Sequence, residues 1–506
     1  MFLSILRTID ELLNGITMYR AMLYFLIILW ILSATLSLVD ALPFNFLEIT
    51  ASSFVILGAC YISNKLFSKI FKVSTNLEST YITALILIFI ILPAKSFPDF
   101  VFIALASVFA MGSKYALAIN KKHIFNPAGI AVFLTAIFSI GYASWWIGNF
   151  WTLIPILIGG LLIVKKIQRI SLIVVFLITF LGATLYFSFI NQSDISSTIK
   201  SLVLDSPILF FSFVMLVEPL TSPTRKKMQI IYGILVGVLA GSQFSIGPFY
   251  STHETALVLG NIFAFLVGFR RRLVLTFLEK SQIANGVYEL KFNLNKKFAY
   301  LPGQYLEWTL SHNKPDSRGV RRYFTIASSP TEDTVRLGIK INKEKSSSFK
   351  KTLMDLENGS KINAGQLGGD FVLPENKSEK LVFIAGGIGI TPFRSIVKYL
   401  IDKKEKRDIV LFYCASDVSD LVYRDLFESA KSIGLKTHYV CTRPPQGWKG
   451  KTGRIDEEMI KEEVLDFSVR TFYLSGPSAM VDGYKKLLKS LGIKPQKIVT
   501  DYFPGY

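Results

Sequence analysis

The sequence has little cysteine and little histidine. Three of its 506 residues are cysteine and four are histidine. No pair of cysteines has the CxxC spacing that cysteine-ligated iron-sulfur clusters use, and no disulfide framework is indicated. Haem between two transmembrane helices would need stacked pairs of histidines, but the apolar first half contains only His123 and His253. The sequence therefore predicts no haem, no iron-sulfur cluster and no metal site.

Charged residues are scarce in the first half of the chain. With 51% hydrophobic residues and a mean hydropathy of +0.42, the protein is too apolar for an ordinary soluble enzyme. Long apolar runs fill residues 22–270, whereas residues 271–506 have the charge density of a soluble protein. The net charge of +19 does not indicate nucleic acid, because much of the Lys and Arg lies between apolar runs. Membrane lipid is the predicted environment of the first half.

The apolar runs predict about ten transmembrane segments. They lie near residues 24–41, 46–64, 80–95, 98–113, 127–141, 150–164, 170–190, 205–219, 229–241 and 255–269. Alternate loops carry most of the Lys and Arg, which is typical of cytoplasmic loops. We therefore expect an integral, multi-pass membrane protein with no cleavable signal peptide. Both ends, and with them the soluble half, are expected on the cytoplasmic side.

Two of the basic-side loops carry distinctive motifs. One reads Lys122-His123-Ile124-Phe125-Asn126-Pro127-Ala128, and the other reads Glu218-Pro219-Leu220-Thr221-Ser222-Pro223-Thr224. They resemble the KHxFNP and DPxTSPT segments of the membrane subunits of the RnfD/NqrB type, over roughly residues 80–270. Without that resemblance, the prolines could simply start helices at the membrane surface.

The resemblance implies electron transfer within the membrane and a second flavin, FMN. Members of that family attach FMN covalently to a Thr in an SGAT-like motif, and the nearest match here is Gly182-Ala183-Thr184 inside an apolar run. Small residues in such a run more often form contacts between helices. If FMN is present, we expect noncovalent binding.

The soluble half changes pattern twice. Alternating apolar and polar residues, punctuated by Gly, Asn and Pro, predict an antiparallel β-barrel through about residue 374. From about Glu379, buried strands alternate with helices, as in an open parallel sheet. The predicted fold is thus a multi-domain chain, with a polytopic α-helical membrane domain (1–270), an antiparallel FAD-binding β-barrel (271–375) and an α/β nucleotide-binding domain (376–506).

A glycine-rich turn follows the first strand of the α/β domain. The segment 381–392 reads LVFIAGGIGITP, a buried strand that runs into glycines and then into a helix opened by proline. Glycines permit close approach of a pyrophosphate, and the amides at the helix start can bind its charge. The candidate dinucleotide-binding residues are Gly386, Gly387, Gly389, Thr391 and Pro392.

A second motif lies about sixty residues upstream. Arg321-Arg322-Tyr323-Phe324-Thr325 fits the RxY[ST] pattern of ferredoxin-NADP reductase-like enzymes. The resemblance implies that Arg322 binds the FAD pyrophosphate, that the aromatic residues Tyr323 and Phe324 border the flavin, and that the Thr325 hydroxyl lies near its N5 atom. An arginine fork suits a pyrophosphate because it donates several hydrogen bonds in a fixed geometry.

Further segments match the same reductases in the expected order. Pro302-Gly303-Gln304-Tyr305 and Gly368-Gly369-Asp370-Phe371 flank the barrel, and Ser475-Gly476-Pro477-Ser478-Ala479-Met480 resembles CGPxxM. Ser475 there replaces the usual Cys beside the nicotinamide, so Thr325 and Ser475 are the candidate catalytic residues, with Gly476, Pro477 and Met480 as cofactor contacts. Ser347 and Ser348 lie where relatives bind a second FAD phosphate, although the customary Gly is missing.

The resemblances imply a membrane-bound FAD-dependent NAD(P)H oxidoreductase. Asp417, after the strand Ile409–Tyr413, should repel the 2′-phosphate of NADPH and favour NADH. The aromatic C-terminal tail, residues 501–506, should lie near the flavin. Electrons would pass through the membrane domain to a quinone or to a redox protein on the outer side, with partner subunits possible. Two alternatives stay open: a redox-driven Na⁺ or H⁺ transporter, and a membrane-anchored reductase that feeds a soluble acceptor.

Overall fold

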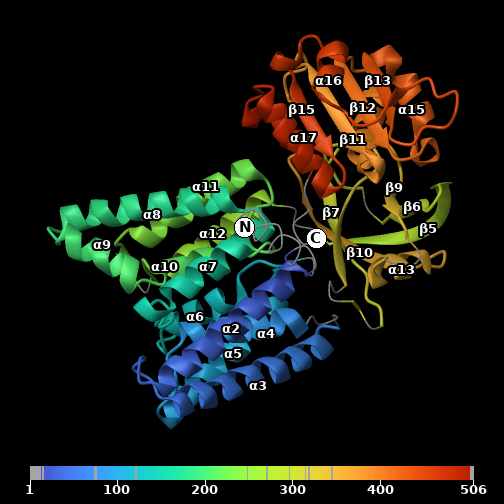
Figure 1. Ribbon diagram of the computed structural model, residues 1–506. Helices are drawn as coiled ribbons and strands as arrows, with labels where there is room; N and C mark the ends of the chain where they lie inside the picture. The colour runs from blue at the N-terminus through green and yellow to red at the C-terminus, as the bar shows by residue number, and fades with distance from the viewer. Residues whose placement is uncertain are drawn as a thin grey trace. The chain divides into compact units, whose positions relative to one another are not determined.

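The structure is a computed structural model that forms two compact units, residues 1–272 and 273–503 (Figure 1). It describes residues 13, 16–72, 77–119, 122–247, 249–268, 272–295, 297–313, 315–316, 320–342 and 346–501. The expected position of the aromatic residues 502–506 beside the flavin falls outside the described residues.

The first unit consists of apolar helices. They are α2 (Met18–Leu38), α3 (Phe46–Ile70), α4 (Leu77–Ile90), α5 (Phe97–Ala116), α6 (Pro127–Ile137), α7 (Phe150–Ile167), α8 (Ile170–Ile190), α9 (Ile195–Leu204), α10 (Ile208–Phe210) with the π-helix η1 (Phe211–Met215), α11 (Lys226–Gly241) and α12 (His253–Val267). Two short hairpins, β1–β2 (Ala118–Ile119, Lys122–His123) and β3–β4 (Ser245–Ile246, Phe249–Tyr250), complete it.

Local sequence explains where several of these helices begin. Asn45 and Glu48 form a capping box at the start of α3, and the Asn149 side chain accepts hydrogen bonds from the amides of Trp151 and Thr152 at the start of α7. These side chains bond amides that would otherwise have no partner in the first turn. Pro127 at the start of α6 lacks the amide that would need one.

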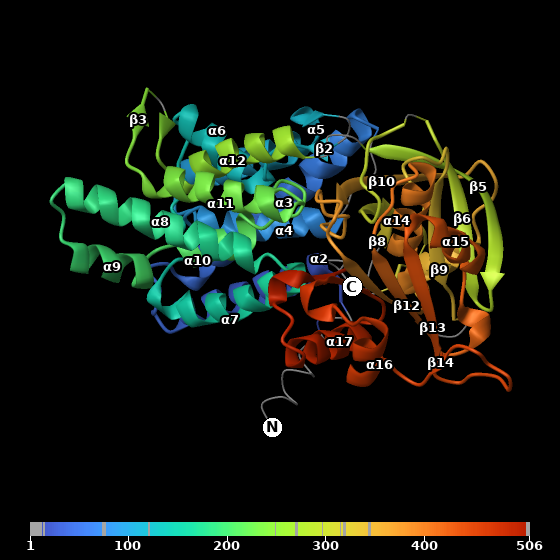
Figure 2. The same cartoon turned by 90° about the horizontal axis from the view of Figure 1, so that it is seen from above.

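Helices α8 and α11 run side by side in both views (Figures 1 and 2). Glycines on α11 permit the close approach: a Cβ at Gly237 would lie 2.0 Å from Thr179 Oγ1, and one at Gly233 would lie 3.1 Å from the Leu172 carbonyl oxygen. Small residues at such contacts are typical of helix pairs in membranes, where dispersion forces between closely packed helices replace the hydrophobic effect.

The apolar helical fold is confirmed, but not every helix is long enough to cross a membrane by itself. Each of the ten predicted segments contains a helix. Among the described residues, however, only five helices are long and apolar enough to cross a membrane, or six if the pair 195–204 and 208–215, bent by 56°, forms one span. With 14 and 11 residues, α4 and α6 are shorter than the roughly 20 residues that a bilayer requires.

Helix α9 lies between two of the predicted apolar segments, 170–190 and 205–219. Asp194 caps it through hydrogen bonds from the amides of Ser196 and Ser197, and none of its residues is buried. The N-cap explains where the helix begins, and its apolar side chains Ile195, Ile199 and Val203 are exposed.

The second unit begins with a six-stranded antiparallel sheet in the order β8-β7-β10-β5-β6-β9. Its strands are β5 (Leu273–Ala284), β6 (Val287–Leu294), β7 (Tyr305–Thr309), β8 (Arg321–Thr325), β9 (Val335–Lys340) and β10 (Lys361–Gly368), and the short helix α13 (Ser348–Met354) lies between β9 and β10. The predicted antiparallel half of the reductase is confirmed. Its core includes the fully buried Trp308 and Phe292, whose rings lie 5.1 Å apart.

A parallel sheet follows in the order β14-β13-β12-β11-β15-β16. Its strands are β11 (Leu381–Gly386), β12 (Ile409–Ala415), β13 (Leu435–Cys441), β14 (Lys451–Thr452), β15 (Thr471–Ser475) and β16 (Ile498–Thr500); the main helices are α14 (Thr391–Asp402), α15 (Arg424–Ser429), α16 (Glu457–Glu463) and α17 (Ser478–Ser490). One core packs against α14 and α15 and the other against α16 and α17, so helices cover both faces of the sheet (Figure 2).

The order of the parallel strands places a topological switch point beside β11. From β11 the chain moves to β12 and β13 on one side and later returns to β15 on the other side. In open α/β sheets, ligands bind outside the carboxyl ends of the strands at such a point. A ligand site is therefore expected at the loops that follow β11 and β15.

Candidate functional site

Asp501 joins the two sheets of the reductase unit at their candidate catalytic residues. Its Oδ2 atom accepts a hydrogen bond from the Ser475 hydroxyl at 3.1 Å and one from the Thr325 hydroxyl at 3.4 Å. Thr325 ends β8 of the antiparallel sheet, and Ser475 ends β15 of the parallel sheet. Two residues that the sequence predicted separately, 150 positions apart by number (475 − 325), thus meet at one carboxylate.

The carboxylate of Asp501 is well removed from water. Burial raises its pKa to about 7, although the hydrogen bonds from Ser475 and Thr325 act in the opposite direction. Among the described residues, no positively charged side chain contributes to this shift, so burial dominates. An acid with this pKa can hold or release a proton near neutral pH.

The sequence prediction places Asp501 in the tail expected near the flavin, residues 501–506, but assigns no role to its carboxylate. The signal was weak: one Asp directly after the last short strand, Ile498–Thr500, in a segment that carries no recognised motif. Only the tertiary structure shows that its main-chain amide bonds the Leu474 carbonyl oxygen at 3.0 Å and thereby brings the side chain to Ser475.

The glycine-rich turn packs tightly against the Ser475–Met480 segment. A Cβ at Gly389 would lie 2.5 Å from the Ser475 carbonyl oxygen, and one at Gly386 would lie 2.4 Å from the Met480 sulfur. Gly387 has a φ of +53°, and a Cβ there would have nothing within 4 Å. Gly386 and Gly389 therefore allow two loops to meet, whereas Gly387 leaves room beside the turn.

Thr391 and Pro392 begin α14 directly after this turn. The Thr391 hydroxyl donates to the Ile388 carbonyl oxygen at 3.2 Å, and the proline takes an early position in the first turn. On the other side of the switch point, Gly476 has no Cβ to collide with Met480, and Pro477 precedes α17. All the predicted dinucleotide contacts thus lie at the carboxyl ends of β11 and β15.

The four predicted residues on β8 divide between the two faces of the strand, because side chains alternate along it. Arg322 and Phe324 both contact the Phe349 ring, at 5.3 Å and 5.9 Å. On the other face, the Tyr323 hydroxyl donates to Glu307 at 2.8 Å, and Thr325 reaches Asp501. Of these four, Thr325 is the one that meets the second sheet.

Arg322 lies in an anion-binding arrangement. Its guanidinium, which is almost fully buried, pairs with the carboxylate of Asp316 at 3.1 Å, and that carboxylate also accepts a hydrogen bond from the Ser348 amide at 3.0 Å. The Ser347 hydroxyl caps α13 by accepting from the Lys350 amide at 3.3 Å. Arg322 and the Ser348 amide thus converge on one negatively charged group.

Buried charges tie the antiparallel sheet to α14. Arg394 on α14 binds Glu332 in a bidentate pair and also donates to the Ala327 carbonyl oxygen. Burial alone would raise the pKa of Glu332, but the hydrogen bonds and the charge of Arg394 hold it below its usual range. Tyr423 donates to Glu289 at 3.0 Å, a second link of this kind. These pairs join the antiparallel part of the unit to the parallel part.

The two motifs of the helical unit meet at Glu218. Its carboxylate accepts hydrogen bonds from the Asn126 side chain at 2.8 Å and from the Thr221 hydroxyl at 3.0 Å, and His123 lies 3.7 Å away. Asn261, from α12, bonds both loops. Its side chain accepts a hydrogen bond from the main-chain amide of Asn126 and donates one to the Thr221 carbonyl oxygen. Sequence reasoning missed Asn261, a single polar residue in an apolar run.

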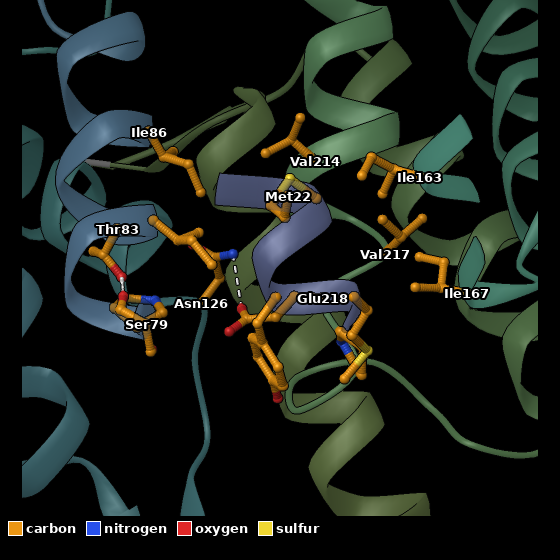
Figure 3. A pocket seen from close by; sticks show the side chains of 15 residues that line it. Met22, Ser79, Thr83, Ile86, Asn126, Ile163, Ile167, Val214, Val217 and Glu218 are labelled. Atoms are coloured by element: carbon orange, nitrogen blue, oxygen red, sulfur yellow. Dashed lines mark hydrogen bonds between the residues drawn. The ribbon is translucent and has the colours of Figure 1, made fainter. Parts of the chain in front are cut away.

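A pocket opens beside this pair (Figure 3). Asn126, Glu218, Ser79 and Thr83 contribute polar groups to its lining, and apolar side chains such as Ile86, Ile163 and Val214 provide much of the rest. Met22 from α2 also points into it. A largely apolar wall with a few polar groups is typical of sites that bind small organic molecules.

Thr184 has a packing role in this structure. A Cβ at Gly241 of α11 would lie 3.0 Å from the Thr184 hydroxyl oxygen, and that oxygen is buried without a hydrogen-bond partner among the described residues. These contacts fit the helix-packing interpretation and give no support to a covalent flavin at Thr184.

Comparisons with known proteins match two parts of the chain to two families. Residues 116–271 match the model of the NQR2, RnfD, RnfE family. Residues 383–486 match the model of the oxidoreductase NAD-binding domain. Together with the apolar helices, the first match indicates a membrane protein.

Curated relatives match the reductase half. The chain is 28% identical to stachydrine N-demethylase reductase subunit Stc4 of Rhizobium meliloti over 41% of this chain and 60% of the relative. It is also 28% identical to flavohemoprotein of Bacillus subtilis (40% and 51%) and to NADH-cytochrome b5 reductase 1 of Emericella nidulans (44% and 75%). The chain thus spans only 60% and 51% of the first two relatives.

Among solved structures, cytochrome P450 reductase GcoB of Amycolatopsis matches with a TM-score of 0.41 and 25% identity, over 46% of this chain and 69% of that one. The chain therefore joins an NQR2, RnfD, RnfE family domain to a reductase half that contains an oxidoreductase NAD-binding domain.

Proposed function

We propose that the protein is a membrane-bound, FAD-dependent oxidoreductase that takes electrons from NADH and passes them into its helical unit. The observation that carries the proposal is the meeting of Thr325 and Ser475 at Asp501, between an antiparallel sheet and the switch point of a parallel sheet. The names of the relatives, which include an NADH-cytochrome b5 reductase and two reductase subunits, support the same reaction class.

The residues present fit FAD. The carboxylate of Asp316 between Arg322 and the Ser348 amide is a stand-in for a phosphate oxygen, so this position accepts a negatively charged group. Arg322, Ser347 and Ser348 would hold the pyrophosphate, with Phe324, on the same face of β8 as Arg322, beside the flavin. Tyr323 lies on the other face, where its hydroxyl bonds Glu307. Bound FAD would accept a hydride from a dihydronicotinamide and release electrons one or two at a time.

The chain's own residues organise that reaction. Gly387, Thr391 and Pro392 would receive the pyrophosphate of the dinucleotide at the start of α14, and Gly476 and Met480 would border its nicotinamide. Asp501 holds a proton near neutral pH and orients the hydroxyls of Thr325 and Ser475. Ser475 fills the place of a Cys without supplying a thiol, so its role is to position groups.

The helical unit would supply the route onward. The pocket at Asn126 and Glu218 offers hydrogen-bond partners and an apolar wall to a planar acceptor, either a noncovalently bound FMN or a quinone ring. Because basic loops favour the cytoplasmic side and NADH is found there, we place the reductase unit in the cytoplasm.

The acceptor distinguishes the proposal from its main alternative. Reductase subunits of an N-demethylase and of a monooxygenase appear among the relatives, which favours an anchored reductase that feeds a soluble partner as the second candidate. Full-length protein in proteoliposomes should reduce a membrane quinone with NADH. A Glu218→Gln variant should lose quinone reduction but keep reduction of ferricyanide, a soluble acceptor that can take electrons from FAD directly. Equal quinone reduction by both proteins would contradict a route through the helical unit and favour the anchored reductase.

A further inference from the structure

An ion pair lies at the carboxyl ends of two neighbouring strands of the parallel sheet. Arg443, after β13, donates to the carboxylate of Asp417, after β12, at 2.8 Å. The side chains are 72% and 47% exposed, so both can reach a ligand. Sequence reasoning considered Asp417 alone and expected it to repel NADPH.

Backbone contacts fix the distance between these two residues. The Arg443 amide donates to the Ser416 carbonyl oxygen at 2.9 Å, and the Thr442 amide donates to the Ala415 carbonyl oxygen at 3.1 Å. The Cys441 thiol also lies 3.2 Å from the Ser416 carbonyl oxygen. The pairing therefore continues past the last strand residues, and the two charged side chains leave adjacent, firmly held positions.

The place of the pair in the sheet identifies what it would meet. β12 lies next to β11, whose glycine turn begins the dinucleotide site. In dinucleotide-binding sheets, an acidic residue after the second strand bonds the ribose 2′-hydroxyl of NADH, whereas a nearby arginine accommodates the 2′-phosphate of NADPH. Here one residue of each kind is present, and each neutralises the other.

We infer that Arg443 can bind the 2′-phosphate of NADPH and that its ion pair with Asp417 keeps it from doing so. This inference rests on the proposed function and concerns how the same site distinguishes NADH from NADPH. With the pair intact, the net charge that a 2′-phosphate meets is close to zero, so the repulsion expected from Asp417 alone is largely offset. NADH is then preferred because only Asp417 can accept a hydrogen bond from a 2′-hydroxyl.

The energetics allow a ligand to separate the pair. Exposed ion pairs contribute little to stability, so a phosphate could take the guanidinium from the carboxylate. An arginine also binds a phosphate with two parallel hydrogen bonds. Removing Asp417 should free Arg443 for that role, and removing Arg443 should leave the carboxylate to repel NADPH without compensation.

The test uses the full-length, FAD-loaded protein and compares kcat/KM for NADPH with that for NADH, with ferricyanide as acceptor. Asp417→Ser should raise the NADPH/NADH ratio about tenfold or more, the size expected for one charge-assisted hydrogen bond. Arg443→Ala should lower the ratio, and the double variant should lose the gain of Asp417→Ser. Glu457→Gln serves as the control, because it breaks an exposed ion pair with Lys461 on α16, and the ratio should not change.

Two results would overturn the inference. If Asp417→Ser left the NADPH/NADH ratio unchanged, the Asp417 carboxylate would not keep Arg443 from binding a 2′-phosphate. If the double variant kept the full gain, Arg443 would not be that ligand. Failure of both nucleotides to reduce the unaltered protein would instead overturn the proposed function, and this inference with it.

Discussion

The Ser475 hydroxyl donates a hydrogen bond to the Asp501 carboxylate at 3.1 Å, across the boundary between the two sheets of the reductase unit. The same oxygen atom accepts from Thr325. A single buried acid thus links the ends of β8 and β15, where a flavin and a nicotinamide would have to meet.

The first prediction concerns the pH dependence of the reaction. Because the pKa of Asp501 is about 7, the group is protonated below neutral pH and ionised above it. The rate of flavin reduction by NADH should therefore change with an apparent pKa near 7, and Asp501→Asn should remove this transition. Stopped-flow reduction from pH 5.5 to 8.5 measures it. An unchanged profile in the variant would exclude Asp501 as the titrating group.

The same shift predicts an effect on stability. Burial raises the pKa of Asp501 from 3.8 to about 7, so the folded protein binds this proton more tightly than the unfolded chain does. The stabilisation is complete below about pH 4 and is lost as the pH rises through 7. Asp501→Asn, which cannot ionise, should gain in Tm relative to the unaltered protein as the pH rises from 4 to 7. A constant difference in Tm would contradict the shift.

The FAD site can be tested with two adjacent arginines. Arg322 faces the Asp316 carboxylate, whereas Arg321 lies on the other face of β8 and pairs with Glu307 at 3.4 Å. Arg322→Ala should weaken FAD binding about tenfold or more, since it removes charge-assisted hydrogen bonds, and Arg321→Ala should weaken it far less. Quenching of FAD fluorescence measures both affinities. Equal effects would show that the motif was aligned incorrectly.

The contact between the two loops makes Gly389 sensitive to substitution. Gly389→Ala places a methyl group against the main chain of Ser475 and Gly476, so the loops must separate, and NADH should bind more weakly. Gly483→Ala on α17 is the control, because nothing lies within 4 Å of its Cβ position; in a helix this change should stabilise the protein by about 1 kcal/mol. The KM for NADH and the Tm of both variants check the prediction.

Strong local patterns in the sequence predicted much of the reductase fold. The strand from Leu381 runs into glycines and then into a helix that begins with Thr391 and Pro392, as expected, because turn chemistry and burial agree there. The domain limits at 270 and 375 stay predictions. The roles of Arg322, Ser347 and the other site residues also stay predictions, since they depend on ligands.

Other features depend on contacts that no local pattern encodes. Asp501 acquires its pKa from tertiary burial, and Asn261 acquires its role from two loops far away in the sequence. Hydropathy marks about ten apolar segments, whereas five or six helices among the described residues have the length of a span, because hydropathy does not show where a helix such as α6 ends. Arg443 was missed because its partner, Asp417, becomes a neighbour only through the pairing of β12 with β13.

The central claim is that electrons from NADH enter FAD in the reductase unit and continue to a second flavin, FMN, in the helical unit. An anaerobic titration of the purified full-length protein with NADH, followed by acid extraction of its flavins, tests this most directly. The account predicts two flavins bleached per chain, one FAD and one noncovalently bound FMN. A single bleached flavin, FAD alone, would contradict the second flavin and leave quinone or a partner protein as the direct acceptor.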